Sequence, residues 1–473
     1  MLKKIVLTFF FLSISRSLFA IEPIPGRLLI KVKLGYKIES IVPQIQYKVV
    51  EYIYRRASFK NNAPETEKTY GLIFSEAEDI RAISESIKKI SGVKWVSLDY
   101  KIDEPSQPIK TAQIVSGLDT PINAVYIPDT EHRYIRYIPI QQEILVAVID
   151  QGIKYDHRDL KDAIFKNSAE IPNNGIDDDG NGLVDDYMGY DFTQYAFGGG
   201  SNDPTPSSPH GTMVAGLIGA KKDDKLGICG VNPNCKILNV KWNSVADISY
   251  CIRYAVDMGA KVINCSFGFA NIDTEFPDFR ESYAYAIEKG CIVVVSAGNN
   301  GVQVNDNPQR FPNMTVVTSH TGLERQVPGE PVRYGGANYG PEVSFASYGV
   351  NVYSTGVDEW SANEGTGTSY SAPIVAGILS RIWANNPSLT RQQVLDKAIQ
   401  YTVPLDSGTG HGRIDSEALA KSYVTVQTKK VNLNLGNKRG LLEVDYVTSN
   451  GVTRRFAESF YFSGRKYSIH REL

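Results

Sequence analysis

The stretch EILVAVID, residues 143–150, decides the fold of the larger part of this chain. It is apolar almost without a break until its last residue, which is typical of a strand buried on both faces of a sheet. Comparable runs follow at KILNVKW (236–242), KVINCSF (261–267), CIVVVSAG (291–298) and MTVVTS (314–319). Patterns with helical spacing separate them, such as 246–259 and 279–290. Strands alternating with helices predict an α/β fold, with a parallel sheet covered by helices on both faces.

A smaller α+β unit is expected before this sheet. RLLIKVK (27–33), KVVEYIY (48–54) and TYGLIF (69–74) read as strands. EAEDIRAISESIKKI, residues 76–90, has apolar residues at helical spacing, and the strand VKWVSLDY (93–100) follows Gly92. Residues 104–140 have a weak pattern with five prolines, which indicates a linker or a segment wrapped on the surface.

The two ends of the chain carry their own signals. Lys3 and Lys4 precede an apolar run from Ile5 to Ile14, and Ala20 offers a small residue for cleavage. This layout predicts a secretory signal peptide over residues 1–20, because the run is shorter than the roughly 20 residues that span a bilayer. No later segment reads as a membrane span. Residues 426–473 alternate in polarity and predict a short β-rich extension. The chain is therefore expected to divide into a signal peptide (1–20), the small α+β unit (21–103), the main α/β domain (104–425) and this extension (426–473).

The composition narrows the class of protein. The chain has 473 residues with a formal net charge of −2, which suits two or three globular domains and gives no indication of nucleic-acid binding. Its five cysteines cannot form a closed disulfide framework. Only Cys229 and Cys235 share a loop-like segment, so a disulfide between them stays an open alternative.

Four polar residues lie at positions where parallel α/β sheets usually carry their functional side chains. Asp150 ends the strand EILVAVID, and Asn299 follows the strand CIVVVSAG. His210 lies in SPHGTMVAG, where a polar loop turns into a helical run. Ser369 lies in GTGTSYSAPIVAG, a Gly-rich turn that opens a helix. Strand ends and helix starts are the places where α/β sheets hold ligands and chemistry.

These residue types are the parts that acyl transfer needs. A serine hydroxyl is a weak nucleophile until an imidazole takes its proton. The imidazole in turn needs a carboxylate that fixes its tautomer. A tetrahedral oxyanion needs donors, which the Ser369 backbone N–H at a helix start and the Asn299 side-chain amide can supply. The set therefore predicts nucleophilic hydrolysis of an acyl group, and an esterase or amidase remains an alternative to a peptidase.

Five separated motifs carry a resemblance to the subtilisin family of serine proteases. They are VAVIDQGIKYDHRDL (146–160), HGTMVAGLIGA (210–220), VINCSFG (262–268), VVSAGNNG (294–301) and GTSYSAPIVAG (367–377). The chain resembles this family over roughly residues 143–423, in the order Asp, His, Asn, Ser. The resemblance implies a subtilisin-like sheet, a triad of Asp150, His210 and Ser369, and Asn299 as the oxyanion amide.

The resemblance also implies a substrate strand and a precursor form. Ser266, Phe267 and Gly268 are expected to pair with the substrate backbone, and residues 21–103 are expected to be a propeptide that inhibits the enzyme. The chain departs from the family pattern in three places. Met213 stands where a second histidine is usual, Gln151 follows the aspartate in place of Ser or Thr, and Thr366 stands where Asn is common.

The acidic segment NNGIDDDGNGLVDD (173–186) predicts a metal site. Asp177, Asp179, Asn181 and Asp185 alternate as oxygen ligands, with the Leu183 carbonyl as a further one, which resembles a calcium loop. The alternative is a solvated acidic loop. Similar insertions occur in many secreted subtilases. No phosphate-binding glycine motif is present, so we expect structural Ca²⁺ and no organic cofactor.

The expected function is thus a secreted, extracellular or periplasmic, serine endopeptidase made as a self-processed precursor. Its partners are expected to be protein or peptide substrates and its own propeptide, with no nucleic acid, no membrane span and a monomeric state. The rival hypothesis is a catalytically inactive protein of the same fold that acts in binding or adhesion. The presence of all four catalytic residue types argues against the rival.

Overall fold

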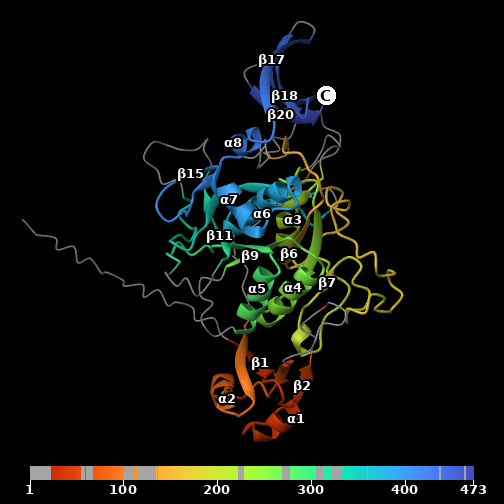
Figure 1. The fold of residues 1–473 in the computed structure, drawn as a ribbon, viewed down its shortest axis with the longest axis vertical. Helices are drawn as coiled ribbons and strands as arrows, with labels where there is room; N and C mark the ends of the chain where they lie inside the picture. Colours follow the sequence, from red (N-terminus) through yellow and green to blue (C-terminus); the bar gives the residue numbers. More distant parts are fainter. Residues whose placement is uncertain are drawn as a thin grey trace, which may run out of the picture.

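The computed structural model describes residues 23–54, 59, 68–100, 110–113, 135, 137–221, 228–268, 277–304, 313–321, 333–358, 361–435, 438–462 and 465–472. The expected signal peptide lies outside these residues. Figure 1 shows an elongated molecule with a small N-terminal unit at one end and a β-sheet at the other. A larger central domain lies between them. We call residues 23–100 the N-terminal unit and residues 137–424 the central domain.

The central domain is built on a nine-stranded sheet in the order β15-β16-β12-β11-β10-β9-β6-β8-β7. All neighbouring strands are parallel except β15 and β16, which are antiparallel. The strands are β6 (Leu145–Asp150), β7 (Tyr190–Asp191), β8 (Lys236–Lys241), β9 (Val262–Gly268), β10 (Ile292–Ser296), β11 (Thr315–His320), β12 (Phe345–Tyr348), β15 (Thr402–Val403) and β16 (Arg413–Ile414). The predicted parallel sheet is confirmed.

Helices cover both faces of this sheet. Val146 and Val148 of β6 pack in one apolar cluster with α3 (His210–Gly219), α6 (Thr368–Asn385) and α7 (Arg391–Ile399). Ala147 and Ile149 face the opposite way, into a cluster with α4 (Val245–Asp257) and α5 (Pro277–Glu288). Successive side chains of a strand point to opposite faces, so an unbroken apolar strand requires a helix layer on each side. The short helix α8 (Ser416–Lys421) follows β16.

The N-terminal unit is an antiparallel sheet with the strand order β2-β3-β1-β4 and a helix on one face. Its elements are β1 (Pro23–Val32), α1 (Ile38–Ile41), η1 (Val42–Gln44), β2 (Glu51–Tyr54), β3 (Lys68–Ile73), α2 (Ile80–Ile87) and β4 (Val93–Tyr100). The Asp79 side chain caps α2 by accepting hydrogen bonds from the N–H groups of Arg81 and Ala82. The strands and the helix expected from the sequence are therefore present.

Charged and aromatic contacts join the N-terminal unit to α4 and α5 of the central domain. Glu281 of α5 forms ion pairs with Lys31 and Lys94, and its other contact is the Trp95 indole N–H at 3.1 Å. The buried Asp99 carboxylate accepts a hydrogen bond from the N–H of Ala246 at the start of α4, at 3.2 Å. Burial raises the pKa of Asp99 to about 6, whereas the hydrogen bond from the Ala246 N–H acts in the opposite direction and stabilises the carboxylate.

An aromatic residue anchors the N-terminal unit at a second place. The Phe59 ring lies 5.7 Å from the ring of Phe192 and 5.5 Å from the ring of Tyr254, measured between centroids. Its backbone N–H donates to the Asp257 carboxylate at 2.7 Å. Phe192 belongs to the segment that contains β7 and the short helix η3 (Tyr195–Phe197). The N-terminal unit thus packs against both the helix layer and this segment.

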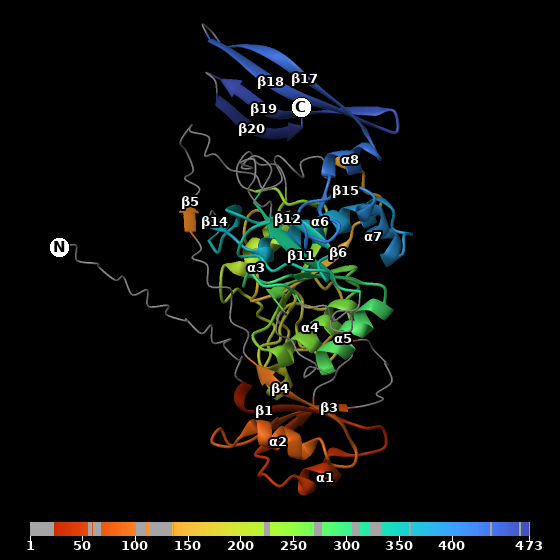
Figure 2. The same ribbon diagram turned by 90° about the vertical axis from the view of Figure 1, so that its left-hand side faces the viewer.

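The chain after β4 contributes to a different sheet. Strand β5 (Lys110–Gln113) pairs antiparallel with β14 (Ser361–Gly365), which pairs with β13 (Val352–Thr355). Figure 2 shows β5 beside β14, whereas β4 lies within the N-terminal unit. The stretch expected to be a linker therefore holds a strand that belongs with the central domain.

The C-terminal extension is a four-stranded antiparallel meander, as the alternating pattern predicts. Its strands are β17 (Thr425–Leu435), β18 (Lys438–Ser449), β19 (Val452–Phe462) and β20 (Arg465–Glu472). The Tyr137 hydroxyl donates to the buried Asp445 carboxylate at 3.1 Å, and the Tyr137 ring lies 4.8 Å from that of Phe456. These contacts fix the sheet to the central domain.

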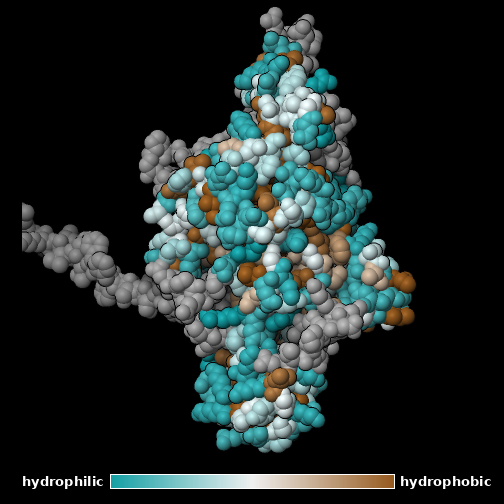
Figure 3. Space-filling view, in the orientation of Figure 1, coloured by the Kyte–Doolittle hydropathy of each residue, from teal (hydrophilic) through white to brown (hydrophobic). Residues whose placement is uncertain are grey.

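Two further expectations can be compared with the described residues. All five cysteines are buried free thiols, so Cys229 and Cys235 form no disulfide in this structure. No helix in the described ranges is long and apolar enough to cross a membrane. The view in Figure 3 is predominantly hydrophilic, with brown, hydrophobic atoms at the edge where Figure 1 draws the loop between β6 and β7. That loop exposes Ile171 and Ile176.

Candidate active site

The sheet places Asp150 and His210 in direct contact. Asp150 is the last residue of β6, and His210 is the first residue of α3. The His210 Nδ1 atom lies 2.9 Å from Asp150 Oδ1 and 3.1 Å from Oδ2, and both residues are buried. Asp150 Oδ1 also accepts the Gln151 N–H at 2.8 Å. A carboxylate at this position keeps the imidazole proton on Nδ1, which leaves Nε2 as the basic nitrogen.

Glycine makes this close approach possible. A Cβ atom at Gly211 would lie 2.4 Å from the carbonyl oxygen of Gly152 and 3.0 Å from the Cβ atom of Asp150. Any larger residue would therefore push the start of α3 away from the end of β6. The His210 N–H at this helix start donates to the Ser208 hydroxyl at 3.2 Å. Close packing thus explains why glycine follows the histidine in the sequence motif.

Ser369 lies in the first turn of α6, and the residue after it contacts the His210 ring. The Ser369 side chain is buried, and the ring of the next residue, Tyr370, lies 5.6 Å from the His210 ring between centroids. The Ser369 carbonyl oxygen accepts the Ser266 hydroxyl at 2.8 Å, which ties the helix start to β9. A serine at a helix N-terminus has its own N–H available as a donor, because the first four N–H groups of a helix lack partners within it.

Asn299 is hydrogen-bonded to the same helix start. Its Oδ1 atom accepts the N–H of Thr368 at 2.9 Å and the Thr368 hydroxyl at 3.1 Å. Because a backbone N–H can only donate, the atom facing Thr368 must be the oxygen, and Nδ2 occupies the opposite side of the carboxamide. A Cβ atom at Gly367 would lie 3.2 Å from the Asn299 amide. Asn299 is therefore held at the same helix start that carries the Ser369 N–H.

The expected substrate strand forms the end of β9. Pairing with β6 stops at Cys265, whereas pairing with β10 continues to Gly268. The backbone of residues 266–268 thus extends beyond the β6 ladder. The buried Phe267 ring packs on the Trp242 ring, with centroids 4.5 Å apart. Ser266 is buried as well, and its hydroxyl donates to the Ser369 carbonyl.

The three departures from the family pattern have local explanations. Met213 is fully buried among apolar residues of the α3 and α6 layer, where a thioether packs well. Gln151 donates its backbone N–H to Asp150, and this bond does not depend on which side chain residue 151 carries. The Thr366 hydroxyl accepts the Asn351 N–H at 2.8 Å, which fixes the turn before α6.

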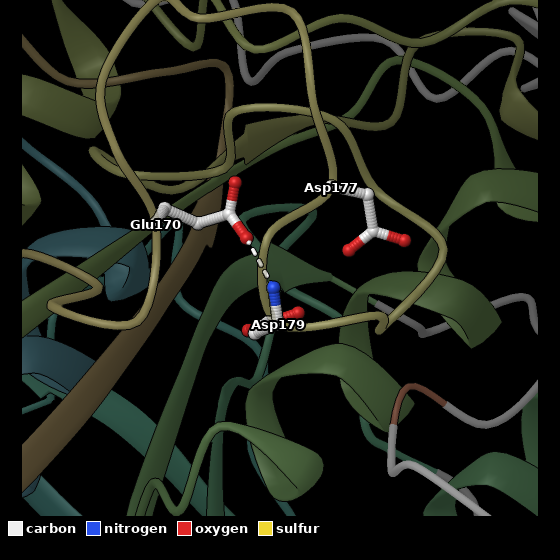
Figure 4. A group of neighbouring side chains, drawn as sticks. All are labelled: Glu170, Asp177 and Asp179. Atoms are coloured by element: carbon white, nitrogen blue, oxygen red, sulfur yellow. Dashed lines mark hydrogen bonds between the residues drawn. The ribbon is translucent and has the colours of Figure 1, made fainter.

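The acidic loop brings together a set of carboxylates that differs from the expected one. One carboxylate oxygen from each of Glu170, Asp177 and Asp179 lies within 4.8 Å of the others. Figure 4 shows the three side chains in this loop. Asp185 instead accepts the N–H groups of Asn174 and Gly175. Glu170 was missed from the sequence because it lies outside the acidic run, seven residues before Asp177.

Asn181 serves this loop in a different way. Its Oδ1 atom accepts the Leu183 N–H at 2.7 Å, and its Nδ2 group donates to Asp179 and Asp186. The Leu183 and Asn181 positions are thereby fixed by hydrogen bonds inside the loop. The observed cluster and the predicted ligands share Asp177 and Asp179.

The chemistry of this cluster fits a hard cation. Glu170 is only 4% exposed, its Oε1 atom accepts the Asp179 N–H at 3.0 Å, and its buried Oε2 atom has no hydrogen-bond partner. Burial raises the pKa of Glu170, and the nearby charges of Asp179, Asp178 and Asp177 raise it further. Oxygen-only donor sets with several carboxylates are those that Ca²⁺ prefers.

Comparison with known proteins identifies the family. A sequence profile described as "Subtilase family" matches residues 141–436, which is more than half of the chain. The chain belongs to the subtilase family. The match begins just before β6 of this subtilase and includes Asp150, His210, Asn299 and Ser369.

Curated relatives of the subtilase carry related names. It is 32% identical over 288 residues to "Subtilisin-like protease 1" of Plasmodium berghei, covering 55% of this chain and 46% of the relative. It is 32% identical over 282 residues to "Thermophilic serine proteinase" of Bacillus sp., covering 57% and 60%. It is 29% identical over 288 residues to "Halolysin-like extracellular serine protease Nep" of Natrialba magadii, covering 58% and 47%. The chain spans about half the length of the curated relatives it matches.

Proposed function

We propose that this subtilase is a serine endopeptidase that uses Asp150, His210 and Ser369 as its triad. The observation that carries the proposal is the 2.9 Å contact of the His210 imidazole with Asp150. The buried Ser369 opens α6, and the following residue, Tyr370, contacts the His210 ring. The names of the curated relatives support the same activity. The rival hypothesis, an inactive binding protein, does not explain why the Asp150–His210 contact and the buried Ser369 are present.

The reaction follows from the positions of these groups. Ser369 Oγ attacks the peptide carbonyl carbon while its proton passes to Nε2 of His210, and Asp150 stabilises the imidazolium that forms. The oxyanion accepts hydrogen bonds from the Ser369 N–H and from Asn299 Nδ2. When the C–N bond breaks, the leaving amine takes the proton from His210 and an acyl-enzyme remains. Water then repeats the sequence and releases the acid and Ser369.

Residues 266–268 are proposed to hold the substrate backbone. Ser266 and Gly268 end β9 beside the helix start that carries Ser369, and the ladder to β6 has already stopped at Cys265. An extended peptide can add a strand to such a segment through main-chain hydrogen bonds. Gly268 has no side chain to obstruct the residue that precedes the scissile bond. Proteins and peptides are the substrates that this arrangement suits.

Residues 21–103 are proposed to be a propeptide that the enzyme itself removes. The ion pairs of Glu281 with Lys31 and Lys94 support a unit that packs on α4 and α5 without being part of the central sheet. Strand β4 ends at Tyr100, and β5 begins at Lys110 in a sheet of the central domain. We place the first cut between these two strands, because a break there leaves both sheets complete.

Self-processing gives the test of the proposed function. When the wild type and Ser369→Ala are expressed without residues 1–20, the wild type should lose a fragment of the size of residues 21–103 and should digest casein. The Ser369→Ala variant should stay at full length, because the nucleophile of the cut is absent. Gel electrophoresis and N-terminal sequencing distinguish the outcomes. Active wild-type enzyme that retains Ile21 as its first residue would contradict the propeptide proposal.

Secretion to an extracellular or periplasmic location is proposed from the N-terminal signal and from the extracellular relative named above. Both features support a site of action outside the cytoplasm. We propose that the mature enzyme is a monomer whose partners are its substrates and its own propeptide.

Structural Ca²⁺ is proposed in the loop between β6 and β7. Glu170, Asp177 and Asp179 would hold the ion, and Ca²⁺ would neutralise three clustered carboxylates and stiffen the loop. The partnerless Oε2 atom of Glu170 is the main support for this proposal, because a buried carboxylate oxygen is costly without a donor or a cation. Asn181 and Asp185, predicted as ligands from spacing, shape the loop through their hydrogen bonds.

Calcium removal should destabilise the enzyme. A ligand present at 100 times its Kd stabilises the native state by about 2.7 kcal/mol, so chelation should lower Tm by several degrees and speed autolysis. Glu170→Gln should lower Tm in Ca²⁺ and should reduce the difference in Tm between Ca²⁺ and chelator. Asp156→Asn, an exposed carboxylate outside the cluster, is the matched control. An equal Tm in Ca²⁺ and in chelator for the wild type would favour the solvated-loop alternative.

A further inference from the structure

The loop that carries Asn299 is held by one buried asparagine from a distant part of the chain. Residues 297–302 follow β10 and have no regular structure beyond it. Asn338 lies between β11 and β12 and is fully buried. Its side chain and its backbone face this loop. Neither the activity proposed above nor the family motifs involve this residue.

Asn338 contacts the loop on both sides of Asn299. Its Nδ2 group donates to the Ala297 carbonyl at 2.9 Å, and its backbone N–H donates to the Gly298 carbonyl at 2.9 Å. Its Oδ1 atom accepts the N–H of Asn300 at 3.0 Å and the N–H of Val302 at 3.1 Å. The Asn338 carboxamide thus donates to a residue that precedes Asn299 in the chain and accepts from residues that follow it. These bonds fix the curvature of the loop.

The chemistry of these contacts requires an amide in this place. Aspartate has no donor for the Ala297 carbonyl, and leucine has neither a donor nor an acceptor. The fit is also tight, because a Cβ atom at Gly298, whose φ is +97°, would lie 2.5 Å from Asn338 Nδ2. A side chain at position 298 would therefore collide with the Asn338 amide, so glycine is needed there for this contact.

The same loop is attached to the start of α6. The Gly298 N–H donates to the Thr368 hydroxyl at 3.1 Å, and that hydroxyl donates to Asn299 Oδ1 at 3.1 Å. Asn338 and Thr368 thus both hold residues 297–300, the segment that contains Asn299. A shift of the loop would move Asn299 Nδ2 relative to the Ser369 N–H, and the two would no longer converge on one oxygen.

We propose that Asn338 is a positioning residue for the oxyanion amide. It holds Asn299 in the geometry that binds a tetrahedral intermediate, and it contacts neither the substrate nor the reacting atoms. The proposal rests on the proposed peptidase function, because it concerns the rate of the same reaction. Displacement of a catalytic group by about 1 Å can cost about 100-fold in rate, which sets the upper size of the effect.

The test measures kcat and KM of the processed enzyme on a short fluorogenic peptide. Asn338→Asp and Asn338→Ala should lower kcat by about 10- to 100-fold with KM changed less than about twofold. The inhibition constant of a peptide aldehyde, which forms a tetrahedral adduct with the serine, should rise by a similar factor. Ser344→Ala is the matched control, because its hydroxyl contacts β11 through the Val316 N–H and not the Asn299 loop.

A double-mutant cycle separates positioning from a general loss of stability. If Asn338 acts through Asn299, the Asn299→Ala/Asn338→Ala double variant should be about as slow as Asn299→Ala alone. Independent, multiplying losses would overturn the proposal, as would an unchanged kcat in both Asn338 variants that fold. An inactive wild type would instead contradict the proposed function. Should Asn338→Ala fail to fold, Asn338→Asp and Asn338→Gln supply the same comparison, with Tm measured for each.

Discussion

Ser369→Ala should lower kcat for peptide hydrolysis by about 10⁶-fold, the size of the loss that removal of the triad serine causes in subtilisin. The substitution removes the atom that forms the acyl-enzyme, whereas Asp150 and His210 keep their contact at the end of β6. Peptide binding should remain, because residues 266–268 and the Ser369 backbone are unchanged. Steady-state hydrolysis of a fluorogenic peptide, with Tm as a check on folding, measures the effect.

Ser371→Ala supplies a matched control on the same helix. Ser371 is as buried as Ser369, but its hydroxyl donates to the carbonyls of Ser347 and Tyr348 and lies two residues further along α6. Its loss should cost about 1 kcal/mol of stability and should leave kcat within a few-fold of the wild type. If Ser371→Ala abolished hydrolysis and Ser369→Ala did not, the assignment of the nucleophile would be wrong.

Asn299→Ala should lower kcat by about 10²- to 10³-fold with little change in KM, as loss of the oxyanion amide does in subtilisin. The alanine variant also loses the contacts that Asn299 Oδ1 makes with Thr368. Asn299→Asp separates the two roles, since a carboxylate can still accept the Thr368 N–H but has no hydrogen to give to the oxyanion.

Both variants should therefore be slow if the donor matters. Near-normal kcat in Asn299→Asp would show that Asn299 only supports the helix start. Asn300→Ala, which changes the exposed neighbouring side chain, should keep wild-type kcat and serves as the control. The kinetic comparison is made on the pH plateau of each enzyme, because Asn299→Asp adds a negative charge near the site.

The central sheet could be predicted because its signal is local. EILVAVID and the four later apolar runs each give a strand that must be covered on both faces, and the helical patterns between them supply the cover. Asp150 and Asn299 end or follow such strands, and His210 and Ser369 open helices, so the motifs also indicate where the residues meet. The contact of Asp150 with His210 agrees with that expectation.

Other features depend on contacts that no local pattern encodes. Glu170 reaches Asp179 only because the loop folds back on itself, so ligand spacing in the acidic run could not reveal it. Asn338 holds a loop that lies 36 or more residues earlier in the chain, and nothing in its own sequence neighbourhood indicates that task. Strand β5 is likewise recognisable only beside β14. The Glu170 contact, the role of Asn338 and the pairing of β5 all depend on tertiary contacts that local sequence does not encode.

The most direct test of the central claim is the identification of the residue that a fluorophosphonate modifies in the purified protein. Such reagents phosphonylate a serine that an adjacent imidazole activates, with loss of fluoride, so they report on the nucleophile without any assumption about the substrate. Mass spectrometry of the digested adduct should place the label on Ser369, and His210→Ala should abolish labelling while Ser371→Ala should not. No labelling of the folded wild type, or a label on any other residue, would contradict the proposed triad.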